Sequence, residues 1–225
     1  MSVNRTAITP ELDAYILEKF SADDDFLIEL RKQAISQKIP DISISPDQAK
    51  FIQVLLKSMN AKYVLEIGTL AGYSSITMGR ALAVGSKLIT VENNNLHYKF
   101  ALEKIKQAGL SEIIDVYYGY ALDFFANFKP NYLLDFVFMD ADKKNLKNYL
   151  DICTPLIRSG GIFAVDNAFA LGNLTVANPE FDEIHKHRIH DVYAVREFNE
   201  YFGSHPDFDT CMLTIGDGLI MGVKK

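Results

Sequence analysis

Hydrophobic residues recur every three or four positions through residues 1–60, which is the period of amphipathic helices. Three helix starts are expected there: Thr9-Pro10, the acids at 23–25, and Ser45-Pro46-Asp47-Gln48, which has the form of a capping box. Because these helices precede the first strand, they must pack beside or over a sheet. In the first helix Leu12, Tyr15 and Ile16 share a face, the second carries Phe26, Leu27, Leu30 and Ala34, and the third is expected to turn Phe51, Val54 and Leu55 inward.

From residue 61 onward, short apolar runs alternate with helical segments. Strands are expected at 64–67, 88–91, 113–117, 136–139 and 162–165, and helices at 73–83, 95–108, 121–128 and 145–157. Repeated βα units imply a parallel sheet whose ligands bind outside the carboxyl ends of the strands. The end of the chain differs, because Gly216-Asp217-Gly218 between apolar runs at 211–215 and 219–223 predicts an antiparallel hairpin.

The bulk composition favours one domain over residues 1–225, with a helical extension at 1–60 and a cofactor-binding core at 61–225. The net charge of −6 and a pI near 5.4 give no broad electrostatic footprint for nucleic acid. Two cysteines, Cys153 and Cys211, make no disulfide framework. There is no apolar segment of membrane-spanning length and no secretory signal in the first ten residues, so we expect a cytoplasmic protein without a membrane partner.

The stretch at 64–75 organises the rest of the sequence. An apolar run ends in Glu66, the glycines Gly68 and Gly72 bracket a tight loop, and Ser74 lies in the helix start that follows. The spacing E-x-G-x-x-x-G differs from both the dinucleotide fingerprint and the P-loop. It resembles the first motif of the class I S-adenosylmethionine-dependent methyltransferases. An ordinary strand–turn–helix with packing glycines is the alternative interpretation of this stretch alone.

Acidic residues end four of the expected strands: Glu66, Glu92, Asp140 and Asp166, which is followed by Asn167. Caps and turns explain any one of these acids, but they explain the whole set poorly. Glu92 lies about twenty residues beyond Gly72, the separation at which an acid binds ribose hydroxyls, although a solvated turn acid would look the same. The backbone at Gly119-Tyr120-Ala121 would lie near an adenine, or would form a plain turn.

Asp140, Asp166 and Asn167 should lie close together at neighbouring strand ends. Three oxygen ligands without cysteine or histidine favour a hard cation such as Mg²⁺. Lys143 follows Asp140 by three residues and can point over the same cleft, although a solvated lysine at a helix start is the commoner case.

Four motifs together resemble the cation-dependent O-methyltransferases, the family of the catechol and caffeoyl-CoA O-methyltransferases and their bacterial relatives. They are the segment from Glu66 to Ser75, Asp140-Ala141-Asp142-Lys143-Lys144-Asn145, Val165-Asp166-Asn167 and Ile215-Gly216-Asp217-Gly218. The resemblance covers the chain from about Ile39 to the C-terminus. It implies an α/β fold with a seven-stranded, mostly parallel, Rossmann-like sheet, helices on both faces and a C-terminal antiparallel hairpin.

By the same resemblance, the residues of the site have expected roles. Asp140, Asp166 and Asn167 would bind a divalent cation, Mg²⁺ or alternatively Ca²⁺ or Mn²⁺. Lys143 would be the catalytic lysine beside Asp140, and Lys143 and Arg196 would lie near the substrate. S-adenosylmethionine would contact the backbone at Ile44 and then Glu66, Gly68, Thr69, Ser74, Glu92, Ala121 and Asp140.

The expected reaction is methylation of one hydroxyl of a small vicinal dihydroxyl aromatic compound. Two alternatives stay open: O-methylation of a hydroxylated base in tRNA, and a non-catalytic protein that binds S-adenosylmethionine. We also expect a homodimer, because the N-terminal helices carry more apolar surface than a lid requires.

The segment after Asn167 departs from the plant enzymes of the family, so a CoA-linked acceptor has no support from the sequence. A long loop is expected at 168–179. The nearby histidines His185, His187 and His190 lack a spacing that fits zinc, and an exposed helical segment is the preferred interpretation.

Overall fold

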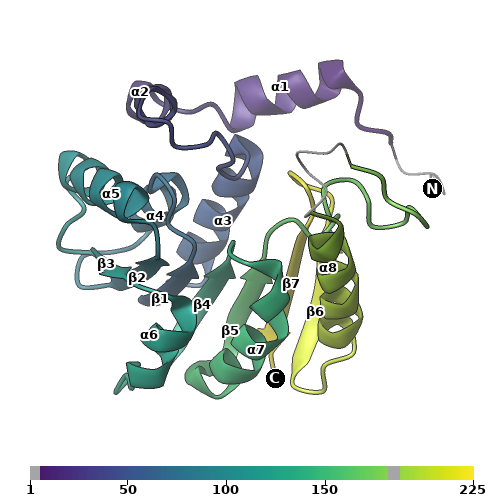
Figure 1. Ribbon diagram of the computed structural model, residues 1–225. Helices are drawn as coiled ribbons and strands as arrows, with labels where there is room; N and C mark the ends of the chain where they lie inside the picture. Colours follow the sequence, from purple (N-terminus) through teal and green to yellow (C-terminus); the bar gives the residue numbers. More distant parts are fainter. Residues whose placement is uncertain (1–5, 182–187) are drawn as a thin grey trace.

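The computed structural model describes residues 6–181 and 188–225, and within them seven strands form one sheet (Figure 1). The strand order is β3-β2-β1-β4-β5-β7-β6, with β1 to β5 parallel and β7 antiparallel to both of its neighbours. This arrangement confirms the expected parallel sheet with a C-terminal hairpin. The strands are β1 (Tyr63–Ile67), β2 (Lys87–Glu92), β3 (Ile114–Tyr118), β4 (Leu134–Met139), β5 (Ile157–Val165), β6 (Phe208–Leu213) and β7 (Leu219–Lys224).

Helices cover both faces of this sheet. One face packs against α3, α4 and α5, the other packs against α6, α7 and α8, and α2 packs on α4. None of the helices in the described part of the chain is long and apolar enough to cross a bilayer. The helices are α1 (Pro10–Phe20), α2 (Asp25–Ser36), α3 (Pro46–Ser58), α4 (Tyr73–Gly79), α5 (Asn95–Gln107), α6 (Ala121–Asn127), α7 (Leu146–Cys153) and α8 (Arg188–Gly203), with short 3₁₀ turns at Lys143–Asn145 and Thr154–Leu156.

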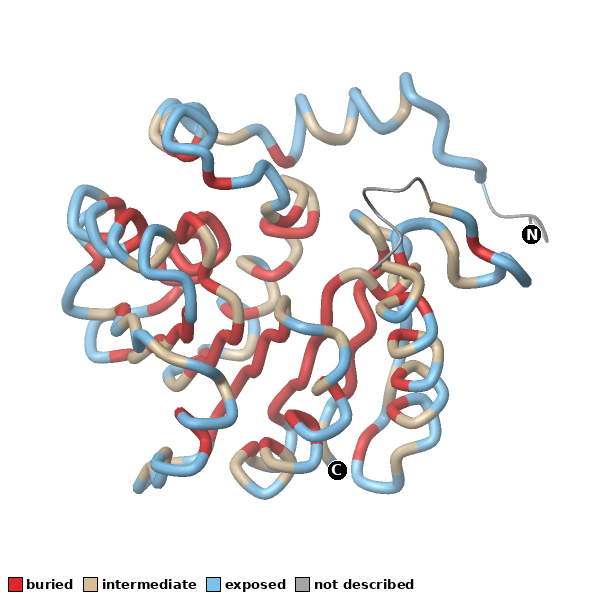
Figure 2. The backbone as a smooth tube through the Cα atoms, in the orientation of Figure 1, coloured by how far each residue is buried: buried red, intermediate tan, exposed pale blue. Residues whose placement is uncertain are grey.

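The central strands are buried on both faces, as Figure 2 shows by their continuous red. In β4, Phe136 and Phe138 belong to the first core cluster, whereas Val137 and Met139 belong to the second. This alternation follows from the two-residue period of a strand. The unbroken apolar run of β4 is therefore typical of a parallel strand between two helical layers.

The three N-terminal helices contribute unequally to the core. In α2 the predicted residues Leu27, Leu30 and Ala34 are buried, and Asp24 caps the helix by accepting a hydrogen bond from Leu27 N at 3.0 Å. In α1, Leu12 and Ile16 of the predicted shared face are half-buried, whereas Tyr15 is 53% exposed, and the helix has no fully buried residue in a single chain. Thr9 caps this helix by accepting a hydrogen bond from Leu12 N.

Helix α3 turns a different set of residues toward the core than the sequence predicted. It buries Ala49, Ile52 and Leu56, while Val54, an expected core residue, is 60% exposed. The predicted capping box at its start is also wrong: Ser45 makes no side-chain capping bond, and Gln48 reaches Asp166 instead of the helix start. A capping-box pattern in the sequence cannot reveal that a distant carboxylate competes for the amide.

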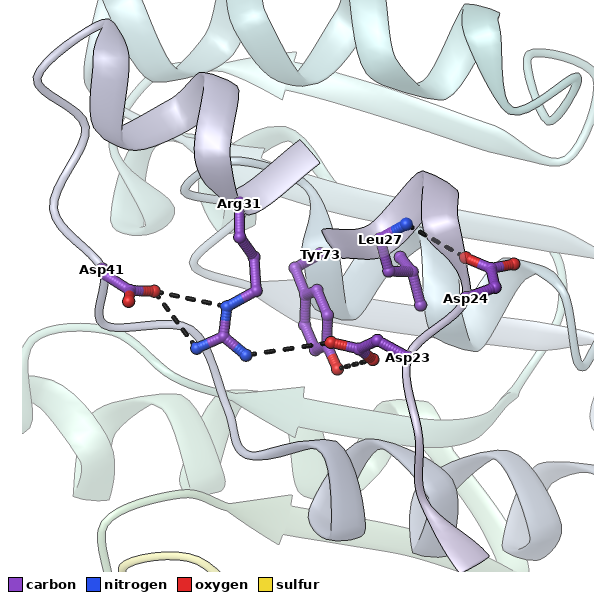
Figure 3. Close-up of polar contacts among 6 residues, drawn as sticks. All are labelled: Asp23, Asp24, Leu27, Arg31, Asp41 and Tyr73. Carbon is purple, nitrogen blue, oxygen red and sulfur yellow. Dashed lines mark hydrogen bonds and ion pairs between the residues drawn. The ribbon is translucent and has the colours of Figure 1, made fainter. Parts of the chain in front are cut away.

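A polar cluster attaches α2 to the first turn of α4 (Figure 3). The hydroxyl of Tyr73 donates to Asp23 Oδ1 at 2.6 Å, and the Arg31 guanidinium lies between Asp23 and Asp41. Arg31 also lies over the ring of Tyr73, with its Cζ 5.4 Å from the ring centre. Because Ile42 follows Asp41 directly and lines the cavity described below, this cluster holds the N-terminal segment against the site.

Two predicted boundaries are wrong around α7 and β5. The helix ends at Cys153, and the strand begins at Ile157, which had been assigned to the helix. Pro155 lies in the 3₁₀ turn between them and lacks the backbone N–H that a longer helix would need. Similarly, α4 stops at Gly79 rather than continuing to residue 83.

Asp135 joins three strands at the edge of the sheet opposite the carboxyl ends. Its carboxylate accepts hydrogen bonds from Lys62 N at 2.8 Å, Tyr63 N at 2.9 Å and Arg158 Nε at 2.6 Å. Burial raises the pKa of Asp135, but the hydrogen bonds from Arg158 and the two amides outweigh it and leave the pKa below its usual value. A carboxyl group whose pKa is lower in the folded protein than in the unfolded chain stabilises the fold. This contribution is fully present at pH values above the group's pKa in the unfolded chain.

Asp135→Asn should therefore lower the free energy of unfolding at pH 7 by about 1–3 kcal/mol, since it removes charge-assisted hydrogen bonds from two partly buried main-chain amides and from Arg158. The difference from the wild type should shrink as the pH falls below about 4, because the wild-type carboxyl then becomes protonated. Urea titrations across this pH range measure both effects. Asp115→Asn, which removes an exposed acid 3.4 Å from Lys87, serves as the control, and an equal loss at every pH would contradict the argument.

Candidate active site

A cavity of about 1040 Å³ opens at the carboxyl ends of the parallel strands. Its wall includes Gly68 after β1, Glu92 at the end of β2, Gly119 and Ala121 after β3, and Asp140 after β4. The sequence predicted this edge of the sheet as the ligand-binding edge. From the other side, α8 contributes Asp191, Val192 and Val195, none of which the sequence analysis had identified.

The loop between β1 and α4 brings main chain close to the floor of the cavity. Gly68 has φ +106°, and a Cβ at this position would collide with the carbonyl oxygen of Asp140. Gly72 has φ +84° and is the N-cap of α4. Both glycines are therefore required by backbone geometry, and the loop between them exposes peptide groups to a ligand.

Glu92 is oriented before any ligand arrives. Its Oε2 accepts from Leu70 N and its Oε1 from Asn94 N, both at 2.8 Å. The carboxylate is only 8% exposed, yet it lines the cavity. Each oxygen keeps a second lone pair, so the group can still accept hydrogen bonds from two neighbouring hydroxyls.

Four other predicted cofactor residues lie beneath or beside the wall. Glu66 is fully buried and accepts a hydrogen bond from the Ser75 hydroxyl, while Oε1 has no partner among the described residues. Burial raises the pKa of Glu66 to about 7. Thr69 bonds Thr90 between hydroxyls at 2.6 Å. Direct contact of Glu66, Thr69, Ser74 and Ile44 with a cofactor stays a prediction, because these residues are buried outside the cavity lining.

Asp140 and Asp166 come together because β4 pairs with β5 in parallel, with Met139 opposite Val165. Each acid is thus the first residue after its strand. Burial and the charge of Asp140 raise the pKa of Asp166 to about 6. The Lys143 ammonium lies 3.6 Å from Asp140 Oδ1 and donates to the carbonyl oxygen of Asp166 at 3.5 Å.

Asn167 completes the predicted oxygen set. It lines the cavity and has φ +60°, a left-handed conformation that is uncommon outside glycine and tolerated best by asparagine and aspartate. Within residues 6–181 and 188–225 no group of three His, Cys, Asp or Glu side chains is arranged to hold a metal. The expected set contains only two carboxylates, and its third member is an amide. Its donor chemistry fits a hard cation, and the mutual repulsion of two partly buried acids is what a cation would relieve.

The turn between β6 and β7 supports the loop that follows Asn167. Asp217 accepts from Leu171 N at 2.7 Å and from Gly172 N at 3.1 Å, and its own carbonyl accepts from Phe169 N at 2.9 Å. In the sequence this motif predicts a hairpin turn and carries part of the family resemblance. Its second function depends on contacts between segments 45 residues apart, which no local pattern reveals.

Arg196, which the resemblance placed near the acceptor, contacts the same loop. Its guanidinium donates to the carbonyl of Asn173 at 2.7 Å and to that of Val176, and it is outside the cavity lining. Arg196 therefore holds the acceptor-side loop, and its contact with a substrate stays a prediction. His190 is exposed on α8, while His185 and His187 lie outside the described residues.

Comparison with known proteins decides the family. An O-methyltransferase family model matches residues 18–225. The chain belongs to the O-methyltransferase family. A catechol O-methyltransferase from Niastella koreensis is 32% identical over 225 residues, covering 97% of this chain and 98% of that protein. Caffeoyl-CoA O-methyltransferase 1 of Arabidopsis thaliana is 32% identical over 215 residues, covering 93% and 82%.

The solved structures agree with this assignment. The O-methyltransferase of Bacillus cereus, in complex with SAH, superposes with a TM-score of 0.85 at 30% identity and covers 96% of this chain and 97% of that one. The family, the fold and the class of enzyme predicted from the sequence are therefore confirmed. In the methyltransferase the glycine loop and the strand-end acids Glu92 and Asp140 line one cavity, whereas Asp166 is buried outside the cavity lining.

The contacts of Glu92 generate a prediction for the expected methyl donor. Glu92→Gln should weaken the affinity for S-adenosylmethionine by about 1–3 kcal/mol, because a buried hydrogen-bonding partner is lost. Calorimetric titration measures the change. Glu112→Gln, at an exposed acid in the turn before β3, is the control and should leave the affinity unchanged. Unaltered binding by the Glu92 variant would mean that this acid only shapes the loop.

Proposed function

We propose that the methyltransferase transfers the methyl group of S-adenosylmethionine to one hydroxyl of a small vicinal dihydroxyl aromatic compound, with a divalent cation at Asp140, Asp166 and Asn167. The observation that carries this proposal is the pair of acids at adjacent strand ends with the Lys143 ammonium beside them. The SAH complex of the Bacillus cereus relative and the names of the catechol and caffeoyl-CoA relatives support it.

The cavity has two parts that suit the two substrates. Gly68, Glu92 and Ala121 lie on the side of β1, β2 and β3, where peptide groups and a carboxylate can hold an adenosyl group. Asp140, Lys143 and Asn167 lie on the side of β4 and β5, beside the apolar side chains that α8 contributes. An aromatic acceptor would pack on the apolar wall with its hydroxyls at the acids.

In the reaction, the bond between sulfur and the methyl carbon breaks as a bond from the acceptor oxygen to that carbon forms, and the hydroxyl proton is released. Asp140, Asp166 and Asn167 would hold the divalent cation, which would supply Lewis-acid chemistry that lowers the pKa of an acceptor hydroxyl. Lys143 has two roles that fit its position: as an ammonium it stabilises the phenolate, and as a free amine it accepts the proton. The preceding residue is linked to α7, because the Asp142 carboxylate accepts a hydrogen bond from the Tyr149 hydroxyl at 2.6 Å.

O-methylation of a hydroxylated tRNA base is the alternative acceptor chemistry. The net charge of −6 disfavours a nucleic-acid partner. Parallel assays with a small catechol and with hydroxylated tRNA separate the two.

We also propose that two copies of the chain pair through their N-terminal helices. Large apolar side chains of this region are exposed in the single chain, and α1 buries none of its residues. Such a surface on a soluble domain favours association. Light scattering that finds only monomer at micromolar concentrations would refute this. The exposed residues are Ile8, Tyr15, Phe20, Ile28 and Ile35.

Chelation tests the proposed cation. Treatment with EDTA should abolish methylation of a catechol and leave the affinity for S-adenosylmethionine within about twofold, because the two parts of the cavity lie on different strands. Added Mg²⁺ should restore turnover. Asp166→Ala should behave like the chelated enzyme, since one carboxylate and one amide hold Mg²⁺ poorly. Full activity in EDTA would exclude the cation from the mechanism.

Lys143→Met should lower kcat by roughly 10²–10⁴-fold if the lysine acts in proton transfer, while cation and donor binding persist. Its neighbour Lys144 provides a matched control, because it lies on the same 3₁₀ turn and is exposed to solvent. Lys144→Met should retain the wild-type rate. Equal activity of the two variants in steady-state assays would show that Lys143 is dispensable.

A further inference from the structure

We propose that Gln48 of α3 is the residue that positions the Asp166 carboxylate for the divalent cation. This inference rests on the proposed function, because it assigns a task at the same cation site. The observation behind it is a buried side-chain contact between the N-terminal helices and the end of β5. The residues involved are 118 positions apart in the chain, and Gln48 Nε2 donates to Asp166 Oδ1 at 2.8 Å.

Both partners are removed from solvent. Gln48 is 1% exposed and Asp166 is 5% exposed, so water does not compete for this hydrogen bond. A carboxylate oxygen can only accept, so the NH₂ group of the amide must be the end that faces Asp166. The bond engages Oδ1 and leaves Oδ2 available to a ligand. Gln48 thereby restricts rotation of the carboxylate and selects the oxygen that a cation meets.

The oxygen end of the amide packs against the β6–β7 turn. Its oxygen lies against Gly216 in the β6–β7 turn, where an added Cβ would collide with it and would also lie 2.9 Å from Ser45 Oγ. Gly216 has φ +53°, which a glycine adopts without strain. The glycine of this turn therefore makes the space in which the Gln48 side chain fits.

The chemistry of glutamine suits this position. A neutral amide stabilises the ionised carboxylate with one hydrogen bond but leaves the negative charge of the acids available to a divalent ion. A lysine or arginine at the same place would neutralise that charge and compete with the ion. Groups that hydrogen-bond to ligating carboxylates typically change metal affinity or activity by about 10–100-fold when they are removed.

The test compares two glutamines on the same helix. Gln48→Met keeps the length of the side chain and removes the donor. Gln53→Met is the matched control, since Gln53 Nε2 also ties α3 to the core by donating to the Thr77 carbonyl at 2.8 Å, away from the acids. Mn²⁺ binding is measured on each purified full-length protein by electron paramagnetic resonance, with thermal unfolding and SAH affinity followed in parallel.

Gln48→Met should weaken Mn²⁺ binding by about 10–100-fold, and the Mg²⁺ concentration for half-maximal activity should rise by a similar factor. At saturating Mg²⁺, kcat should recover to within about threefold, because the acids and Lys143 remain. Gln53→Met should alter stability at most. A merely structural role for Gln48 would lower stability without separating the Mg²⁺ requirement from kcat.

Three results would overturn the inference. Equal Mn²⁺ affinities of Gln48→Met, Gln53→Met and the wild type would remove Gln48 from the site and leave the proposed function standing. A wild-type protein that binds no Mn²⁺ or Mg²⁺ would refute the cation and, with it, the task of Gln48. If Gln48→Met fails to fold, Gln48→Asn takes its place, since this shorter amide cannot span the distance to Asp166, and undiminished Mn²⁺ binding by that variant would also contradict the inference.

Discussion

The site depends on the parallel register of β1, β4 and β5. Ile67 pairs with Met139, and Met139 pairs with Val165, so that three strands end at the same level. The residue that follows each strand must then project from one edge of the sheet. This alignment brings Asp140 and Asp166 together and places the Gly68 backbone against that of Asp140. A shift of one residue in either pairing would turn these side chains to the opposite faces and destroy the constellation.

Periodicity and spacing in the sequence sufficed to predict this framework. The buried strands are apolar runs in the sequence, and the acids at their ends predict the ligand-binding edge of the sheet. Gly68, Glu92, Ala121 and Asp140 line the cavity at this edge, and their contact with a cofactor stays a prediction. The predicted boundaries of helices and strands are wrong where a proline or a pair of glycines lies between two elements. Examples are Pro155, at the end of α7, and the irregular part of β5.

What the sequence could not predict are contacts between distant segments. Gln48 has the local pattern of a helix cap, but its amide binds a carboxylate across the interior. Asp217 has the pattern of a hairpin turn, but it holds the loop beside the site. The family resemblance placed Arg196 near the acceptor, but its guanidinium donates to main-chain carbonyls of the loop. In each case the side chain has several compatible partners, and only the packing of the folded chain selects among them.

The position of β7 has a consequence for how the enzyme is made. This last strand, Leu219–Lys224, inserts between β5 and β6, and the turn before it supports both the loop after Asn167 and the amide of Gln48. A nascent chain that still lacks residues 208–224 can pair β1 to β5, but Asp217 is not yet there to bind the loop after Asn167. Competence for catalysis should therefore arise only after the β6–β7 hairpin has been synthesised and has paired with β5, and a chain that stops before this hairpin would keep much of the sheet without a working site.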